Sequence, residues 1–116
     1  MSNVVKRYTY KVGNPNLVLG GQDIVNLNEL QAPFQASILV DIVSNAARFS
    51  IEFTTDDVTG NNPAAFRWNP VTGVAPGQTS TLQYTLNYPV TAVRLNLASI
   101  TGEVRLSVIQ GLGLLR

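Results

Sequence analysis

Hydrophobic and polar residues alternate along most of this chain with a period of two, which is the pattern of half-buried β-strands. We find no stretch with the spacing of an amphipathic helix. Glycine, proline and asparagine interrupt the alternation at short intervals, for example at Asn14-Pro15 and at Pro89. Strands are therefore expected over residues 4–12, 17–19, 34–43, 48–53, 80–88, 92–97 and 104–108, with a weaker one inside 22–30.

Short turns separate two pairs of these strands, at residues 44–47 and at 101–102, and we expect each pair to form a β-hairpin. The first strand carries Lys6 and Arg7, which suits an edge or an arm better than a central position. The pattern predicts an all-β fold, an antiparallel β-sandwich of jelly-roll-like type with about seven or eight short strands. We expect a single domain over 1–116, with 1–12 and 111–116 as candidate assembly arms.

Composition removes most catalytic chemistry, because the 116 residues include no histidine and no cysteine. Histidine-dependent nucleophiles, imidazole or thiolate metal sites and disulfides are therefore excluded. A net charge of +1 gives no field that would attract nucleic acid. No run reaches the ~20 apolar residues of a membrane helix, and no secretory signal follows the first basic residues. We expect a non-enzymatic binding or structural domain, made in a cytoplasm, with no cofactor, nucleic acid or membrane partner.

The acidic residues allow two alternatives, a catalytic carboxylate pair and a metal-binding site. Glu52 with Asp56 or Asp57 would be a carboxylate pair of the kind that hydrolyses glycosides. Asp56 and Asp57, with Asn61 and Asn62, offer oxygen ligands for Ca²⁺, although their spacing is not that of an EF-hand loop. Asp and Asn are also ordinary turn residues, so we predict neither a catalytic nor a metal site.

Three segments are candidate interfaces. The long connection over 54–78 holds the only tryptophan, beside an arginine, and both types are enriched at interface hot spots; alternatively, its aromatic residues close an open end of the sandwich. The tail after residue 110 places three leucines among glycines, as a self-packed last strand or as a subunit contact. The first strand is basic and carries two tyrosines. The candidate interface residues are Lys6, Arg7, Tyr8, Tyr10, Phe66, Arg67, Trp68, Leu112, Leu114 and Leu115.

The polar strand faces carry hydroxyls and amides in place of charges. Thr79, Thr81, Gln83, Thr85 and Asn87 follow one another at every second position. Such a face suits sugars, or another protein surface with little charge to desolvate. Alternatively, threonine occurs at these positions only because it has a high β-propensity.

The second half of the chain resembles a family. Residues 88–97 read YPVTAVRLNL and residues 101–110 read TGEVRLSVIQ, which is similar to the C-terminal part of small β-sandwich virion proteins of tailed bacteriophages. Upstream, FTTDD at 53–57, NPAA at 62–65 and the tryptophan at position 68 match the same proteins. The resemblance covers residues 51–110 and departs at Val58, where proline is common, and at Glu103 and Arg105, where threonine is common.

The resemblance implies a capsid auxiliary protein of the cement or decoration type. We therefore predict a non-enzymatic virion protein on the capsid surface, which binds and stabilises the shell of the major capsid protein and forms a homo-oligomer, a dimer or trimer. The alternative is a carbohydrate-binding β-sandwich module of a phage fibre or tail, with Trp68, Tyr84 or Tyr88 as stacking platforms. Exposed, coplanar aromatic rings would favour the alternative, and aromatic rings buried in the core would contradict it.

Overall fold

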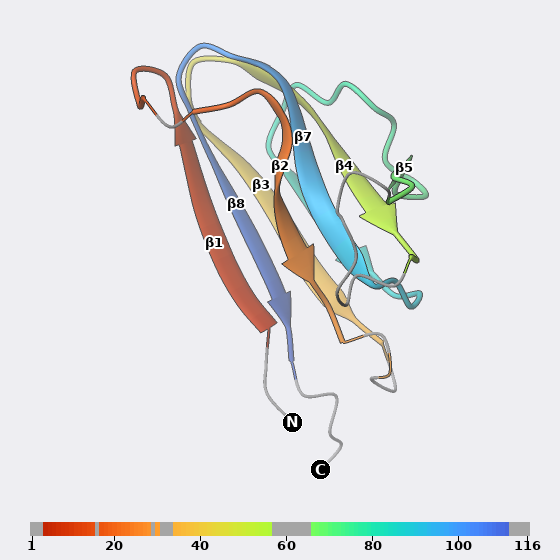
Figure 1. Cartoon of the computed structure of the whole chain (residues 1–116). Helices are drawn as coiled ribbons and strands as arrows, with labels where there is room; N and C mark the ends of the chain where they lie inside the picture. The colour runs from red at the N-terminus through yellow and green to blue at the C-terminus, as the bar shows by residue number, and fades with distance from the viewer. Residues whose placement is uncertain (1–3, 16, 29, 31–33, 57–65, 112–116) are drawn as a thin grey trace.

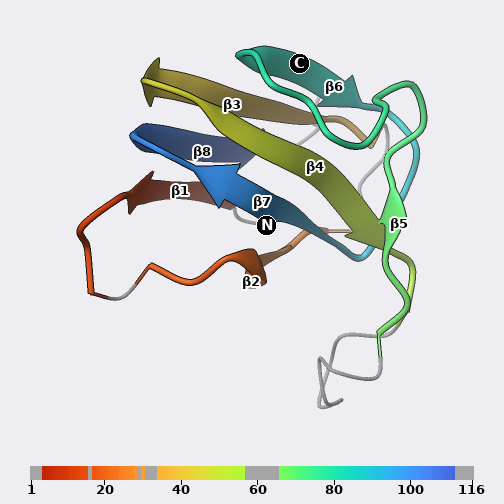
Figure 2. The same cartoon turned by 90° about the horizontal axis from the view of Figure 1, so that it is seen from above.

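The protein is a two-layer β-sandwich (Figures 1 and 2). The computed structural model describes residues 4–15, 17–28, 30, 34–56 and 66–111, and within them there is no helix, hence none that could span a membrane. The strands are β1 (Val4–Lys11), β2 (Gly20–Asn26), β3 (Ala36–Ser44), β4 (Ala47–Thr54), β5 (Asn69–Pro70), β6 (Leu82–Leu86), β7 (Ala92–Ile100) and β8 (Glu103–Gln110).

The two antiparallel sheets have the strand orders β1-β8-β3-β6 and β2-β7-β4-β5. Only β4 and β5 are neighbours both in sequence and in a sheet; every other connection crosses between the two sheets. Eight strands in two sheets with this interleaved order form a jelly roll, a fold used by viral capsid proteins and by lectins. The predicted fold class is confirmed.

The two predicted hairpins are wrong. β3 and β4 follow one another across a short turn, but β3 lies in the first sheet and β4 in the second, and the same is true of β8 and β7. Each turn is thus an arch between the layers, and the two arches lie together, because a Cβ on Gly102 would fall 2.2 Å from the carbonyl oxygen of Ser44. Alternation shows which face of a strand is apolar, but both sheets need the same alternation, so it does not assign a strand to a sheet.

The short strand expected over residues 17–19 is also absent, and Gly20-Gly21 begins β2 instead of closing a strand. Val18 and Leu19 are 56% and 53% exposed, so their side chains contribute little to the core. The long connection after β4 contains β5, whose two residues are too few to produce an alternation.

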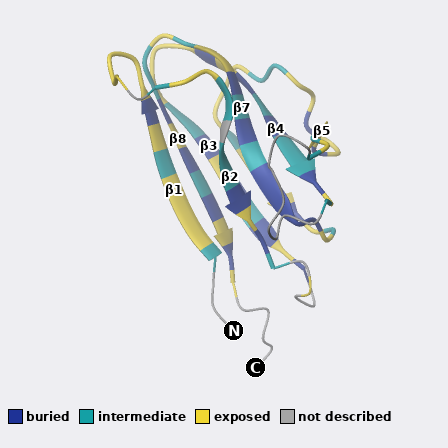
Figure 3. Cartoon of the chain, in the orientation of Figure 1, coloured by how far each residue is buried: buried dark blue, intermediate teal, exposed yellow. Residues whose placement is uncertain are grey.

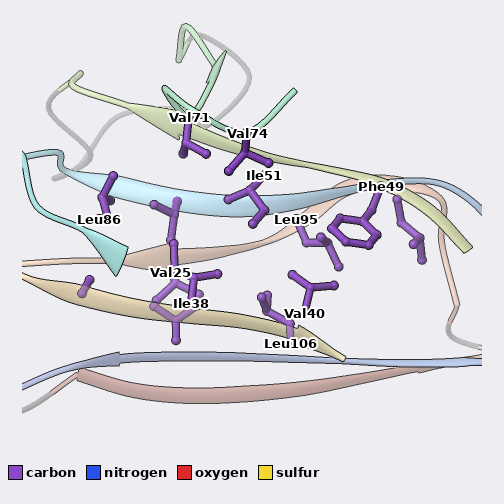
Figure 4. Close-up of a cluster of buried hydrophobic side chains, with 14 of the residues drawn as sticks. Val25, Ile38, Val40, Phe49, Ile51, Val71, Val74, Leu86, Leu95 and Leu106 are labelled. Carbon is purple, nitrogen blue, oxygen red and sulfur yellow. The ribbon is translucent and has the colours of Figure 1, made fainter. Parts of the chain in front are cut away.

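The core lies between the sheets and is built from the inward side chains of both (Figure 4). Phe49 and Ile51 of β4 and Leu95 of β7 meet Ile38 and Val40 of β3 there, and none of these is more than 2% exposed. Because successive side chains of a strand alternate, each inward apolar residue leaves its neighbours on an outer face. The outer faces therefore carry the polar residues available for function.

β1 forms an edge of the first sheet and pairs along its whole length with β8. The first candidate arm is thus, over Val4–Lys11, an integral strand, and most of it is exposed (Figure 3). Tyr10 is its buried residue; its hydroxyl donates a 2.7 Å hydrogen bond to Asp23. Burial and this hydrogen bond raise the pKa of Tyr10 well above its ordinary value. Of the second candidate arm, only Gly111 lies within the described residues.

One buried amide closes the end of the sandwich where β8 finishes. Gln110 is 1% exposed; its Oε1 accepts from the backbone N–H of Asn28 at 2.8 Å, and its Nε2 donates to the Asn28 carbonyl at 3.1 Å. The side chain thus pairs with the backbone as a neighbouring strand would.

Replacing this amide tests its contribution to stability. Gln110→Met keeps the length of the side chain but leaves both backbone groups of Asn28 without their partner, which costs about 1–3 kcal/mol. Urea denaturation monitored by circular dichroism measures the change in the free energy of unfolding. Gln83→Met, at an exposed position of β6, is the matched control and should change stability by less than ~0.5 kcal/mol. Equal effects of the two variants would contradict the role of Gln110.

Candidate ligand-binding face

A partly buried polar cluster occupies the outer face of the β2-β7-β4-β5 sheet. Arg94 of β7 lies opposite Glu52 of β4, and its Nε donates to Glu52 Oε1 at 2.7 Å. The other oxygen of Glu52 accepts from Nδ2 of Asn96 at 3.3 Å. The Arg94 and Glu52 side chains are 21% and 16% exposed, so this ion pair is shielded on most sides. Both oxygens of Glu52 are engaged within the chain.

Trp68 covers the guanidinium of Arg94. The Cζ of Arg94 lies over the indole at 4.3 Å from the ring centroid, a cation–π contact. Phe66 extends the aromatic surface, with its ring centroid 6.2 Å from that of Trp68 and a tilt of 52° between the rings. The guanidinium therefore has an aromatic ring over it in addition to its ion pair with Glu52.

Gly21 of β2 provides the space for this arginine. A Cβ on Gly21 would lie 2.4 Å from Nε and 2.5 Å from Cδ of Arg94, closer than any real contact. A side chain at position 21 would thus displace Arg94. Gly21 on β2 therefore makes room for an ion pair that forms between the next two strands of the sheet, β7 and β4.

Hydrogen bonds at the end of β4 place the segment that carries Trp68. The hydroxyl of Thr91 lies 2.9 Å from the Thr54 carbonyl and 2.6 Å from the Asp56 carbonyl. Asp56 in turn accepts from the backbone N–H of Arg67 through Oδ2 at 2.7 Å. β5 then pairs with β4 immediately after Trp68. The chain is thereby fixed on both sides of the aromatic residue.

Several donors of this face remain available to a ligand. Nε is the only nitrogen of the Arg94 guanidinium that bonds to a residue in the described part of the chain; its two terminal amino groups carry four N–H donors. The ion pairs among the described residues are Arg94–Glu52 and Arg105–Glu103, so Arg48 and Arg67 belong to neither. Within the described part of the chain, these arginines therefore offer donors beside the cluster that have no protein partner.

The other two predicted stacking platforms have structural roles. Tyr84 donates its hydroxyl hydrogen bond to the carbonyl of Thr72, and Tyr88 accepts from the N–H of the same residue at 3.0 Å. Tyr88 also packs edge-on against Phe53, at a centroid distance of 5.7 Å. Burial of the side chain raises the pKa of Tyr84, and the neighbouring Tyr88 hydroxyl raises it further. The Tyr84 hydroxyl therefore stays protonated and can donate a hydrogen bond. These rings anchor the loop before β6, so Trp68 is the one predicted platform on the ligand-binding face.

The structure does not bring the candidate interface residues together. Lys6, Arg7, Tyr8 and Tyr10 lie on β1, at one edge of the first sheet, whereas residues 66–68 adjoin β5, at the opposite side of the sandwich (Figure 2). Leu112, Leu114 and Leu115 lie outside the described residues. The interface role of each residue stays a prediction.

The opposite outer face, on the β1-β8-β3-β6 sheet, is different in chemistry. Val5 and Ile109 are cross-strand partners there, and Leu39 and Val43 lie on the same face of β3. These four side chains are 37–43% exposed. Ser107, Gln83 and Thr85 project from the same face between them, as the register and alternation require. Arg7, Asp41 and Arg105 project from this face as well, because Arg7 pairs with Ser107 and Asp41 pairs with Arg105. The surface around the four apolar side chains is called the aliphatic face below.

The cluster around Arg94 was missed at the sequence level, as was the role of Gly21, whereas Asn96 was expected on a polar strand face. The signal was present, because Glu52 and Arg94 are opposite charges in the middle of expected strands of a chain with only 13% charged residues. The sequence did not show that the strands were neighbours. Among the described residues no group of three or more acidic side chains could hold a metal, and Asp57, Asn61 and Asn62 lie outside them.

Comparisons with known proteins show similarity of fold only. No family model and no curated protein matches this sequence. A solved structure of the xylan-binding CBM22-1 domain of Xyn10C from Paenibacillus barcinonensis is 13% identical, with 96% of this chain and 83% of that one covered and a TM-score of 0.43. The C-terminal family 22 carbohydrate-binding module of Clostridium thermocellum Xyn10B is 12% identical, with 99% and 88% covered and a TM-score of 0.42.

A third solved structure, from a family of disulfide-linked pili that form Bacillus endospore appendages, is 16% identical. It covers 96% of this chain and 89% of that one, with a TM-score of 0.37. Similarities at this level do not assign a ligand, so the function has to be argued from the side chains.

The dependence of Arg94 on Gly21 can be tested with Gly21→Ala. The added methyl group should displace Arg94 from the indole, and the emission of Trp68, the only tryptophan, should shift to longer wavelength with greater quenching by iodide. Gly111→Ala, where a Cβ meets nothing within 4 Å, is the control. An unchanged emission spectrum in Gly21→Ala would show that Arg94 does not occupy the position described.

Proposed function

We propose that this protein is a non-catalytic carbohydrate-binding β-sandwich module of a phage particle, which binds its ligand on the outer face of the β2-β7-β4-β5 sheet. The observation that carries the proposal is the Arg94–Trp68 pair, in which the terminal amino groups of Arg94 bond to no described residue. The resemblance of residues 51–110 to virion proteins supports the phage context.

The chemistry of the face suits sugars. Sugar rings present an apolar edge and several hydroxyls, and proteins bind such small polar ligands with a few well-placed donors and acceptors beside an aromatic surface. Arg94 and Asn96 provide donors, and Phe66 and Trp68 provide the aromatic surface. The ion pair with Glu52 and the contact with Trp68 hold Arg94 in place before a ligand arrives, which lowers the entropy cost of binding.

A glycan array with the full chain tests this function. At least one glycan class should be bound, and Trp68→Ala should weaken that binding by about tenfold or more, because the guanidinium loses its aromatic support. Arg105→Gln is the matched control, since Arg105 is also paired with a carboxylate but lies on the other sheet. An array without any bound glycan, or equal binding by Trp68→Ala, would contradict the proposal.

A second candidate is the cement or decoration role, and the aliphatic face favours it. Exposed apolar patches on soluble proteins commonly mark protein contacts. Many weak copies of such a contact across a repeated shell would add up to firm attachment. In this role the partner is the major capsid protein, the location is the capsid surface, and a dimer or trimer of this chain stays a prediction.

Binding to undecorated shells tests the second candidate. Purified protein should add to the shells at saturation, and the double variant Leu39→Lys/Ile109→Lys should lose this binding, because two ammonium groups would have to be desolvated on the aliphatic face. Val18→Lys, at an exposed valine outside both sheets, is the control. Cryo-EM images of shells without added density, at stoichiometric excess of the wild-type protein, would exclude this role.

A further inference from the structure

The bonding of Glu52 determines what the ligand-binding face has left to offer. One Glu52 oxygen takes the Nε hydrogen of Arg94, and the other takes a hydrogen of Asn96. Glu52 is therefore an internal partner, and each of its oxygens already accepts one hydrogen bond. On the arginine side, the end of the guanidinium carries a fork of N–H groups from the two terminal amino groups, and neither amino group bonds to a described residue.

The described carboxylates on and beside this face are both engaged within the chain. Glu52 is paired with Arg94, and Asp56 accepts from the backbone of Arg67. The described cations are Arg48, Arg67 and Arg94, and neither Arg48 nor Arg67 is in an ion pair with a described residue. Among the described residues, the charged groups left for a ligand are therefore arginines, which attract an anionic ligand more than a neutral one.

The geometry of Arg94 adds a requirement on shape. A guanidinium is a planar fork whose N–H groups match the two oxygens of a carboxylate, and such bidentate pairs are among the strongest hydrogen-bonded contacts. Trp68 on one side and the sheet at Gly21 on the other restrict rotation of this plane. A carboxylate that approaches in the plane of the fork would meet two donors, whereas a hydroxyl in the same place would meet one strong partner.

We infer that the ligand of this face is an acidic sugar, whose carboxylate binds the terminal amino groups of Arg94 while its ring lies beside Phe66 and Trp68. The inference rests on the proposed carbohydrate-binding function and specifies its ligand class. Uronic acids and sialic acids both supply a sugar carboxylate, and the test separates these two sources.

Calorimetry with matched acidic and neutral ligands tests the inference. The probes are an oligogalacturonide against its carboxyl-reduced neutral counterpart, and sialyllactose against lactose. The acidic member of at least one pair should bind about tenfold or more tightly than the neutral member, as expected for a charge-assisted bidentate contact. The pair that shows the difference identifies a uronic or a sialic acid as the source.

Two variants separate the effect of the bidentate geometry of Arg94 from the effect of its positive charge. Arg94→Lys keeps the positive charge but removes the bidentate geometry, and Gly21→Ala keeps the arginine but displaces it; each should abolish the preference for the acidic ligand. Arg105→Lys on the other sheet should leave it unchanged. Circular dichroism confirms that the variants are folded, and either variant is sufficient if the other does not fold.

The outcomes distinguish this inference from the function on which it rests. Equal binding of the acidic and neutral members would overturn the acidic ligand class while the carbohydrate-binding function stands. An acidic preference that persists in Arg94→Lys or Gly21→Ala would also overturn it, because the charge alone, or another cation, would then be responsible. Failure of every glycan, on the array and in calorimetry, would overturn the proposed function as well.

Discussion

The packing of two apolar sheet faces against each other is the constraint on which the rest of this structure depends. Phe49, Ile51 and Leu95 on one sheet meet Ile38 and Val40 on the other, and burial of this surface provides the main driving force of folding. Since side chains alternate along a strand, this inner layer assigns every second residue to an outer face. The alternation that builds the core thus also places the polar cluster and the aliphatic face on the two outer faces.

On the ligand-binding face, the main constraint is the cost of partly burying the charge of Arg94. An arginine that is only 21% exposed needs partners, because a partly desolvated charge without them is costly. Glu52 supplies the counter-charge, Trp68 covers the guanidinium, and Gly21 leaves the space in which it lies. These contacts fix the direction of the unused donors, and this fixed direction is what makes the cluster suited to recognise a ligand.

The two outer faces have different chemistry and lie on opposite sides of the sandwich. A shielded ion pair, an amide and aromatic rings gather over β4 and β7, whereas Val5, Leu39 and Ile109 are exposed on the other sheet. One face can therefore contact a protein surface while the other stays open to solvent. The two proposed roles are thus compatible with each other, and each depends on residues that the other does not use.

Local pattern alone was sufficient for the strands β1, β3, β4, β6, β7 and β8 and for the sandwich class, because alternation and turn residues act over a few neighbours. It was also sufficient to exclude histidine and cysteine chemistry. It placed the start of β2 too late, because Gly20-Gly21 read as a strand end, and it was wrong for both arches, which read as hairpins. Only the tertiary structure decided which strands share a sheet, and with it the meeting of Glu52 and Arg94 across 42 positions of the chain. The physical reason is that alternation within a strand shows only that one of its sides is apolar. Which strands become its neighbours depends on how the whole core packs.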